Sequence, residues 1–326
     1  MNLTILGAGA WGTALARHLH AGGHSLTLWD HDTPNLLILA ATGRNQKYLP
    51  DVELPSDLKV EPSLERAWRG SDLVVLAVPS KWFREVSRTL ATFDGLVVSV
   101  TKGIEYETGL TMSGVLRATA PRARAVALSG PTLALEVARG IPTAAVAASA
   151  DADAAKRAQD LFHRPTFRVY TSTDLLGVEL GGALKNVVAI AAGVGDGLGF
   201  GDNSKAALVT RGMAEMRRLG VACGAQPETF SGLSGLGDLV VTCFSRLSRN
   251  RRLGERLGRG EGLAGVLAQA VSVAEGYPTA RAAWQLARQR GVATPIIDQV
   301  YAMLYEEKNV VEALRDLISR DSKAED

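Results

Sequence analysis

The residue of this chain best suited to chemistry is a lysine in an apolar setting. Lys185 lies within the stretch 174–203, DLLGVELGGALKNVVAIAAGVGDGLGFGDN, which predicts a long helix followed by a glycine-rich loop. Such a helix should be buried on most sides, so the ammonium either reaches water along its own stem or points toward a bound molecule. Burial lowers the pKa of a lysine toward neutrality, where it can act as a general acid or base. Gly181 and Gly182, one turn earlier, would leave room for a ligand on that face.

A glycine-rich turn near the N-terminus could bind a dinucleotide. Gly7-Ala8-Gly9-Ala10-Trp11-Gly12 follows a strand-like run, 3–6, and opens a helix. In this GxGxxG pattern Gly7 allows the tight turn, Gly9 lets a pyrophosphate approach the backbone, and Gly12 lets helix and strand pack closely. The N–H groups of the helix N-terminus would then face the phosphates. The position of the pattern, directly after a first strand, predicts a dinucleotide site.

A second strand ends about twenty residues later, with Asp30-His31-Asp32 after it. Asp30 lies where a carboxylate would accept hydrogen bonds from an adenosine ribose, which favours NAD. His31 could instead contact a 2′-phosphate, particularly when protonated, so NADP stays open. An ordinary acidic turn after a strand is the alternative.

Two further loops should lie at one edge of the predicted sheet. Thr101-Lys102-Gly103 follows the strand-like run 97–100, and Ser129-Gly130-Pro131-Thr132 follows 123–128. Open α/β sheets bind ligands at the carboxyl ends of their parallel strands. Lys102 would present a cation there, while Gly130 and Thr132 would offer backbone and hydroxyl donors. The alternative is that both are ordinary loops with solvated polar residues.

The second half of the chain adds a carboxylate and a run of arginines. Asp238 follows the glycine-rich, apolar segment 232–237. Ser248 is a predicted helix N-cap, which puts Arg249 and Asn250 in a first turn where the helix dipole favours anions over arginines. A bound phosphate would resolve that conflict. The alternatives are a solvated basic helix and a patch for RNA or DNA; the near-neutral net charge of +2 weakens the latter.

The order of strand-like and helical runs predicts the fold. Before residue 172, mostly continuous apolar runs alternate with helical segments, which is typical of a parallel sheet covered on both faces. We therefore expect an α/β protein, with an N-terminal Rossmann-type doubly wound, mostly parallel sheet in residues 1–172 and an all-α C-terminal domain in residues 173–326. The polar tail, 319–326, is expected to fray. The expected strands are 3–6, 25–29, 73–78, 96–100, 123–128, 143–147 and 166–170, and the expected helices are 11–21, 152–162, 174–193, 204–220, 249–257, 279–290, 295–306 and 310–318.

Composition limits the class of protein. The 326 residues have room for roughly two domains, and 46% hydrophobic with 21% charged residues is typical of a globular protein. No run of about 18 uncharged apolar residues exists, so insertion into a membrane is not expected. Cys223 and Cys243 stand far apart, so neither a disulfide framework nor a metal site is expected, and a reducing cytoplasm fits best. The sequence leaves the oligomeric state open, a homodimer included.

The motifs taken together resemble those of one known family. They occur in the order GAGAWGTA (7–14), TKG (101–103), SGPT (129–132), GGALKN (181–186), GLGD (235–238) and SRNRR (248–252), with 45–50 and 273–276 as further segments. In this combination the chain resembles the bacterial-type NAD(P)-dependent glycerol-3-phosphate dehydrogenases over essentially its whole length. The resemblance implies an enzyme that interconverts dihydroxyacetone phosphate and sn-glycerol 3-phosphate with NAD or NADP, supplying the backbone of membrane phospholipids.

The resemblance also implies roles for individual residues. The residue that matches Lys185 is the catalytic acid/base of the family and contacts the substrate. The expected substrate-binding residues are Lys102, Gly130, Thr132, Lys185, Asn186, Asp238, Ser248, Arg249 and Asn250. The glycine turn and Asp30, added to the residues that the resemblance implies, give the full set of expected cofactor-binding residues. They are Gly7, Gly9, Ala10, Trp11, Gly12, Asp30, His31, Tyr48, Lys102, Ala134, Arg249, Val273 and Glu275. The family often carries a basic residue where this chain has Asp30-His31-Asp32, which leaves the cofactor preference open.

Two other functions stay open at the level of sequence. A related two-domain dehydrogenase could act on a 3-hydroxy acid or a sugar acid, but the arginines at 249–252 would then have no phosphate to bind. A dinucleotide-binding regulator without catalysis is the other, and a lysine within an apolar helix argues against it.

Overall fold

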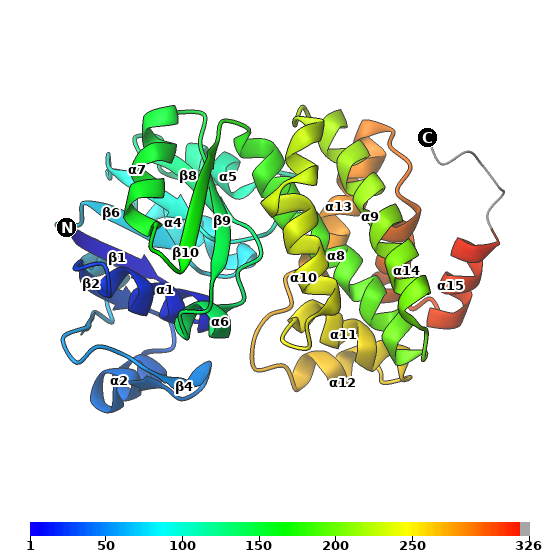
Figure 1. Cartoon of the computed structure of the whole chain (residues 1–326), viewed down its shortest axis with the longest axis horizontal. Coiled ribbons are helices and arrows are strands. Elements are labelled where there is room, and N and C mark those ends of the chain that lie inside the picture. Colours follow the sequence, from blue (N-terminus) through cyan, green and yellow to red (C-terminus); the bar gives the residue numbers. More distant parts are fainter. Residues whose placement is uncertain (320–326) are drawn as a thin grey trace.

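The computed structural model describes residues 1–319 and shows a half built on a sheet beside a half built of helices (Figure 1). Eight strands form one sheet in the order β10-β9-β8-β7-β6-β1-β2-β5. Neighbouring strands are parallel except for the antiparallel pair β8–β9. The predicted doubly wound, mostly parallel sheet is therefore confirmed. Its strands are β1 (Asn2–Leu6), β2 (Ser25–Trp29), β5 (Lys59–Val60), β6 (Leu73–Leu76), β7 (Leu96–Ser99), β8 (Arg124–Ser129), β9 (Thr143–Ala148) and β10 (Phe167–Ser172).

Helices cover both faces of this sheet, which explains why its central strands are apolar throughout. Every residue of β6 and β7 is buried. One face packs with α1 and α7 around Leu15 and Phe162, and the other packs with α4 and α5 around Phe83 and Leu116. Burial on both sides removes the need for polar residues at alternate positions. The helices of this half are α1 (Ala10–His20), α2 (Thr33–Thr42), α3 (Leu64–Ala67), α4 (Ser80–Arg88), α5 (Met112–Thr119), α6 (Ala134–Ala138) and α7 (Ala152–Phe162).

Three short strands have no counterpart in the sequence prediction. β3 (Arg44–Asn45) pairs antiparallel with β4 (Leu49–Glu53) to form a separate two-stranded sheet, and β5 has only two residues at the edge of the main sheet. Their polar residues and a proline give no apolar run for sequence periodicity to detect.

The helical half begins where the sheet ends. β10 ends at Ser172 and α8 begins at Leu175, so a division near residue 172 is our proposal for the domain boundary. No strand occurs between 173 and 319. The polar tail that we expect to fray lies outside the described residues except for Ser319. The helices are α8 (Leu175–Gly197), α9 (Asp202–Ala222), α10 (Asp238–Phe244), α11 (Arg249–Gly258), α12 (Leu263–Ala268), α13 (Gly276–Arg290), α14 (Pro295–Tyr305) and α15 (Val310–Ile318), with a 3-10 turn at Pro227–Ser231 and a π-helical turn at Leu233–Gly237.

Helix α8 is the centre of this half, and α9, α10, α11, α13 and α14 pack against it (Figure 1). Leu184, Val187 and Ile190 of α8 are fully buried in a core that also contains Met216 and Phe230. Among the described residues, α8 is the one helix that is long and apolar enough to cross a membrane, but 83% of its apolar window is buried inside the protein. Its apolar composition therefore has an explanation in the core of the protein.

Helices α8 and α11 touch through their backbones. A Cβ atom on Gly254 of α11 would lie 1.9 Å from the carbonyl oxygen of Ile190, and one on Gly193 of α8 would lie 1.9 Å from that of Arg251. No side chain fits at such separations, so the glycines fix how closely the two helices approach. The N-terminal turn of α11, with Arg249, is thereby held against the helix that carries Lys185.

We expect Gly254→Ala to lower the free energy of unfolding by about 3 kcal/mol or more, the upper end for overpacking, because the atoms in the way are backbone. Gly265→Ala in α12 is the matched control, since a Cβ there meets no atom within 4 Å. That change should be neutral or stabilising by up to about 1 kcal/mol. Urea unfolding followed by circular dichroism measures both, and equal stability of the two variants would contradict close backbone packing.

Candidate active site

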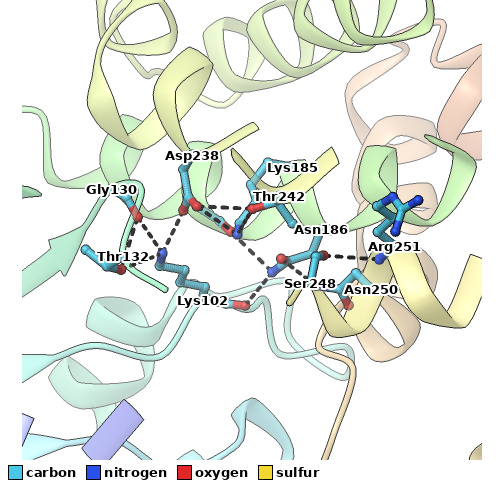
Figure 2. A network of polar contacts seen from close by, with 11 residues as sticks. Lys102, Gly130, Thr132, Lys185, Asn186, Asp238, Thr242, Ser248, Asn250 and Arg251 are labelled. Atoms are coloured by element: carbon cyan, nitrogen blue, oxygen red, sulfur yellow. Dashed lines mark hydrogen bonds and ion pairs between the residues drawn. The ribbon is translucent and has the colours of Figure 1, made fainter. Parts of the chain in front are cut away.

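One carboxylate lies between two lysines where the helical half meets the sheet (Figure 2). Asp238 Oδ1 is 2.9 Å from Lys185 Nζ, and Asp238 Oδ2 is 2.7 Å from Lys102 Nζ. The side chains of Asp238 and Lys185 are 2% and 7% exposed, and that of Lys102 is 16% exposed. The structure thus brings together three of the predicted site residues in a nearly water-free place.

Each of the three comes from a different element. Lys185 lies in the middle of α8, Asp238 begins α10, and Lys102 belongs to the loop after β7. The π-helical turn before α10 fits against α8 because Gly181 has no side chain: a Cβ there would lie 2.9 Å from Ser234 O. Glycine is thus required on α8 for Asp238 to come within reach of Lys185.

The expectation that Gly181 and Gly182 leave room for a ligand is therefore wrong. Beside Gly181 lies the backbone of Ser234, and a Cβ on Gly182 would lie 2.6 Å from Ser129 Oγ. Both glycines let other parts of the protein approach α8. A glycine pattern cannot show whether the neighbour is a ligand or the chain itself.

The ammonium of Lys185 keeps one proton free. It donates to Asp238 Oδ1 at 2.9 Å and to Thr242 Oγ1 at 2.7 Å, and an ammonium has three N–H groups. Burial, the largest influence, lowers its pKa from 10.5 to about 8, with Asp238 raising the value and Lys102 lowering it further. Lys185 can therefore be either protonated or neutral near physiological pH, as an acid/base catalyst must be.

The ammonium of Lys102, by contrast, is fully occupied. It donates to Gly130 O at 2.8 Å, to Thr132 Oγ1 at 3.3 Å and to Asp238 Oδ2 at 2.7 Å. Burial alone would raise the pKa of Asp238, but Lys102 and Lys185 together lower it below its usual value. Asp238 is therefore ionised, and Lys102 has no spare proton with which to bind a substrate unless it gives up a partner.

A row of amides connects this cluster to the N-terminus of α11. Asn186 Nδ2 donates to Lys102 O at 3.3 Å, and Asn186 Oδ1 accepts from Asn250 Nδ2 at 2.7 Å. Asn250 Oδ1 in turn accepts the N–H of Gly276 at 2.8 Å. Because both amides bond to protein groups, they position the elements around the lysines.

The arginine turn is built as predicted from the sequence. Ser248 caps α11, its Oγ accepting the N–H of Arg251 at 3.2 Å. Arg249, the first residue of α11, is exposed, and within residues 1–319 its guanidinium has no hydrogen bond or ion pair. Arg251 lies on another side of the helix, paired with Asp196 at 2.6 Å. The free guanidinium beside a helix N-terminus can bind an anion.

The glycine turn has the shape that a dinucleotide needs. Gly7 has a φ of 117°, and a Cβ on Gly12 would lie 1.8 Å from Gly7 O, so both positions require glycine. A Cβ on Gly9 would meet nothing within 4 Å, and no side chain caps the N-terminus of α1. The indole Nε1 of Trp11 is buried without a hydrogen-bond partner within the described residues. Open space, free N–H groups and an unused donor together fit a pyrophosphate-containing cofactor.

Two groups of the other predicted cofactor residues lie in the sheet half. Asp30 and His31 directly follow β2, three strands from the Lys102 loop, or roughly 14 Å. Tyr48 comes just before β4, beside Lys47, whose ammonium pairs with Asp32. Trp11 and Ala134 pack against one small apolar cluster between the glycine turn and α6. An extended cofactor lying across the carboxyl edge of the sheet would pass from the first group toward the lysines.

Val273 and Glu275 come just before α13, and a Cβ on Gly103, next to Lys102, would lie 3.3 Å from Glu275 Oε2. The carboxylate of Glu275 accepts the N–H of Ser80 at 2.9 Å and its hydroxyl at 2.5 Å, across the junction of the two halves. Burial raises the pKa of Glu275, and the bonds from Ser80 partly offset this. In this conformation Glu275 joins the sheet half to the helical half.

Two residues of the site were not found from the sequence. Thr242 contacts Lys185, and Ser80 holds Glu275. Thr242 lies four residues after Asp238, the spacing that puts two side chains on one helix face, but the glycines before Asp238 concealed the start of α10. Nothing in the local sequence of Ser80 indicates a partner 195 residues away.

Comparison with known proteins places this geometry in context. Family models described as the N-terminus and the C-terminus of NAD-dependent glycerol-3-phosphate dehydrogenase match residues 2–155 and 174–315. Curated glycerol-3-phosphate dehydrogenases (NAD(P)+) of Geobacter metallireducens and Chlorobium limicola are 50% and 48% identical, covering 98% and 100% of this chain and 98% and 99% of their own. The crystal structure of a glycerol-3-phosphate dehydrogenase from Coxiella burnetii is similar with a TM-score of 0.94 and 36% identity, covering 98% of this chain and 99% of that one.

We expect Asp238→Asn to lower the free energy of unfolding at pH 7 by about 3–5 kcal/mol, since it leaves two poorly solvated ammonium groups without a counterion. The folded-state pKa of Asp238 lies below the unfolded value of about 4. Its contribution is therefore present above about pH 4 and is lost as the pH falls through the folded-state pKa. Urea unfolding at pH 7 and in acid should show the gap between wild type and variant closing only in acid.

Asp316→Asn is the control for that experiment, because it breaks an exposed ion pair with Lys308. Such pairs contribute between about 0 and 1 kcal/mol. If the two variants lose the same stability, Asp238 does not act as a buried counterion.

Proposed function

The chain belongs to the family of NAD-dependent glycerol-3-phosphate dehydrogenases, and from this we propose that it interconverts dihydroxyacetone phosphate and sn-glycerol 3-phosphate with NAD(P)H. The observation that carries the proposal is the buried ammonium of Lys185, with a pKa of about 8 and one N–H free. Reduction of a ketone needs a proton at the oxygen as well as a hydride at the carbon. Lys185 is a group that can provide that proton at neutral pH.

Lys185 is proposed as the acid/base of the reaction. NAD(P)H, when bound at the glycine turn, would supply the hydride for C2 of dihydroxyacetone phosphate. The free N–H of Lys185 donates a proton to the oxygen on C2 as negative charge develops there, and the neutral amine recovers a proton from water. In the oxidation of sn-glycerol 3-phosphate, the neutral amine accepts the proton of the C2 hydroxyl.

Asp238, Thr242 and Lys102 support this proton transfer. Asp238 and Thr242 each take one N–H of Lys185, which fixes the direction of the third. Lys102 holds the other oxygen of Asp238, and its positive charge lowers the pKa of Lys185. A carboxylate bound on both oxygens cannot turn away, so the ammonium is aimed before the substrate arrives.

The substrate phosphate is proposed to bind at the N-terminus of α11. Arg249 offers a guanidinium with no partner in the described part of the chain, and the backbone N–H groups of the first turn add a partial positive charge. The Asn186–Asn250 hydrogen bond keeps this turn in place beside Lys185. Binding energy from the phosphate, remote from the reacting carbon, would align C2 with the ammonium.

We propose that the protein works in the cytoplasm and that its glycerol 3-phosphate supplies phospholipid synthesis. A homodimer is our proposal for its assembly, supported by an exposed apolar row on and just before α10 formed by Leu236, Val240 and Phe244, each 42–44% exposed.

Lys185→Met should reduce kcat for dihydroxyacetone phosphate by about 10²–10⁴-fold, the usual contribution of a general acid, while leaving NADH affinity nearly unchanged. In the wild type, reduction should slow as the pH rises through about 8, because Lys185 loses the proton that it must donate. Oxidation of glycerol 3-phosphate should accelerate over the same range. Steady-state NADH absorbance measures all three, and a variant with more than a few per cent of wild-type activity would exclude Lys185 as the acid.

Arg249→Ala should raise the KM for dihydroxyacetone phosphate about 10- to 100-fold, the loss expected for a hydrogen bond to a charged group. Arg252→Ala, in the same helix but with its guanidinium bonded to the backbone oxygen of Arg246, should leave the KM unchanged. Unphosphorylated dihydroxyacetone is the matched substrate, and its turnover should be slow and insensitive to both changes. An unaltered KM in the Arg249 variant would place the phosphate elsewhere.

A further inference from the structure

The carboxyl end of β2 bears on the choice between two nicotinamide cofactors. Asp30 is the first residue after β2, and its Oδ2 accepts the N–H of Ala8, in the glycine turn, at 2.6 Å. In doubly wound folds this corner receives the adenosine ribose of the dinucleotide. NAD has a 2′-hydroxyl there and NADP a 2′-phosphate. The charge at this corner therefore distinguishes the two.

Asp30 is an anion without a permanent countercharge. Within residues 1–319 no lysine or arginine lies within 4.0 Å of its carboxylate, and the residue is 5% exposed. Its Oδ1 accepts the N–H of Asp32 at 2.9 Å and lies 2.9 Å from His31 Nδ1. His31 carries a charge only when protonated, and its side chain is 74% exposed. A ribose hydroxyl can donate to this carboxylate, whereas a phosphate would place a second anion beside it where water screens poorly.

The lysine close to this corner is already engaged. Lys47 Nζ lies 2.7 Å from Asp32 Oδ2, and this hydrogen bond is the main reason that the pKa of Asp32 is lowered. Asp32 is itself held as the N-cap of α2, accepting the N–H of Asn35 at 3.2 Å. To bind a 2′-phosphate, Lys47 would have to leave a carboxylate that cannot follow it.

We propose that Asp30 makes this protein select NAD(H) over NADP(H), and that Asp32 strengthens the selection by holding Lys47. The inference deepens the proposed function and rests on its dinucleotide site. The selection acts on binding: Asp30 attracts the 2′-hydroxyl and repels the 2′-phosphate. Both effects belong to the charge of the carboxylate and not to its shape, so an amide at the same place should remove them.

The test is a fluorescence titration of the full chain with NADH and NADPH, without substrate. The wild type should bind NADH at least tenfold more tightly than NADPH. Asp30→Asn keeps an acceptor oxygen for the Ala8 N–H, gives up the bond from the Asp32 N–H and removes the charge. The ratio of the two Kd values should therefore fall at least tenfold, mainly through tighter NADPH binding. Adding Asp32→Asn releases Lys47 and should lower the ratio by a further severalfold.

Asp160→Asn is the matched control, because it removes one negative charge from α7, where Asp160 forms an exposed pair with Lys156. It should leave the ratio of the two Kd values unchanged.

Equal Kd values for NADH and NADPH in the wild type would overturn the proposal without any variant. If Asp30→Asn weakens both cofactors equally, the carboxylate only anchors the glycine turn and does not select. If circular dichroism shows that the Asp30 variant does not fold, Asp32→Asn alone must still tighten NADPH binding severalfold. An unchanged Kd for NADPH in that variant would contradict the role of the Lys47–Asp32 pair.

Two possible results with the wild-type protein distinguish this proposal from the proposed function. Tight NADH binding with no reduction of dihydroxyacetone phosphate would contradict the function and leave the selection standing. Reduction at equal kcat/KM with NADH and NADPH would contradict the selection and leave the function standing.

Discussion

The site depends on a single carboxylate that two lysines share. Asp238 satisfies Lys185 with one oxygen and Lys102 with the other, in a place almost closed to water. Without it, two like charges would face each other with little screening. Buried ion pairs of this kind rarely add stability over apolar packing. Their presence at the junction of two halves is better explained by chemistry, since the arrangement gives one lysine a pKa near neutrality while fixing its direction.

Close helix packing connects this arrangement to the proposed phosphate site. Gly193 and Gly254 bring α8 and α11 into backbone contact, and the Asn186–Asn250 hydrogen bond joins the same two helices near their functional ends. Lys185, the proposed proton donor, and the turn proposed to bind the phosphate are therefore parts of one block. Their spacing is set by backbone atoms, which adjust far less than side chains do. A substrate with its phosphate too near to or too far from the ketone would not fit both.

Much of the fold could be predicted because local sequence reports burial. Continuous apolar runs identified the sheet, the glycine pattern identified the first turn, and Ser248 marked the start of α11. The direction of β9 could not be predicted, because a strand buried in a sheet has the same composition in either orientation. The hydrogen-bond partners of Asp238 could not be predicted either, because Lys185 and Lys102 lie 53 and 136 residues away in the chain. The family resemblance suggested that these three residues lie together, and the structure shows the hydrogen bonds between them.

Of the three charges in this cluster, only Lys102 belongs to the sheet half. Any motion that separates the halves would take it away from Asp238 and remove its repulsion of Lys185, whose proton affinity would then rise. Closing the halves would have the opposite effect and make the proton easier to give up. Domain closure and proton binding are thus thermodynamically linked through one ion pair. The enzyme would hold its proton firmly while open and become a stronger acid as it closes.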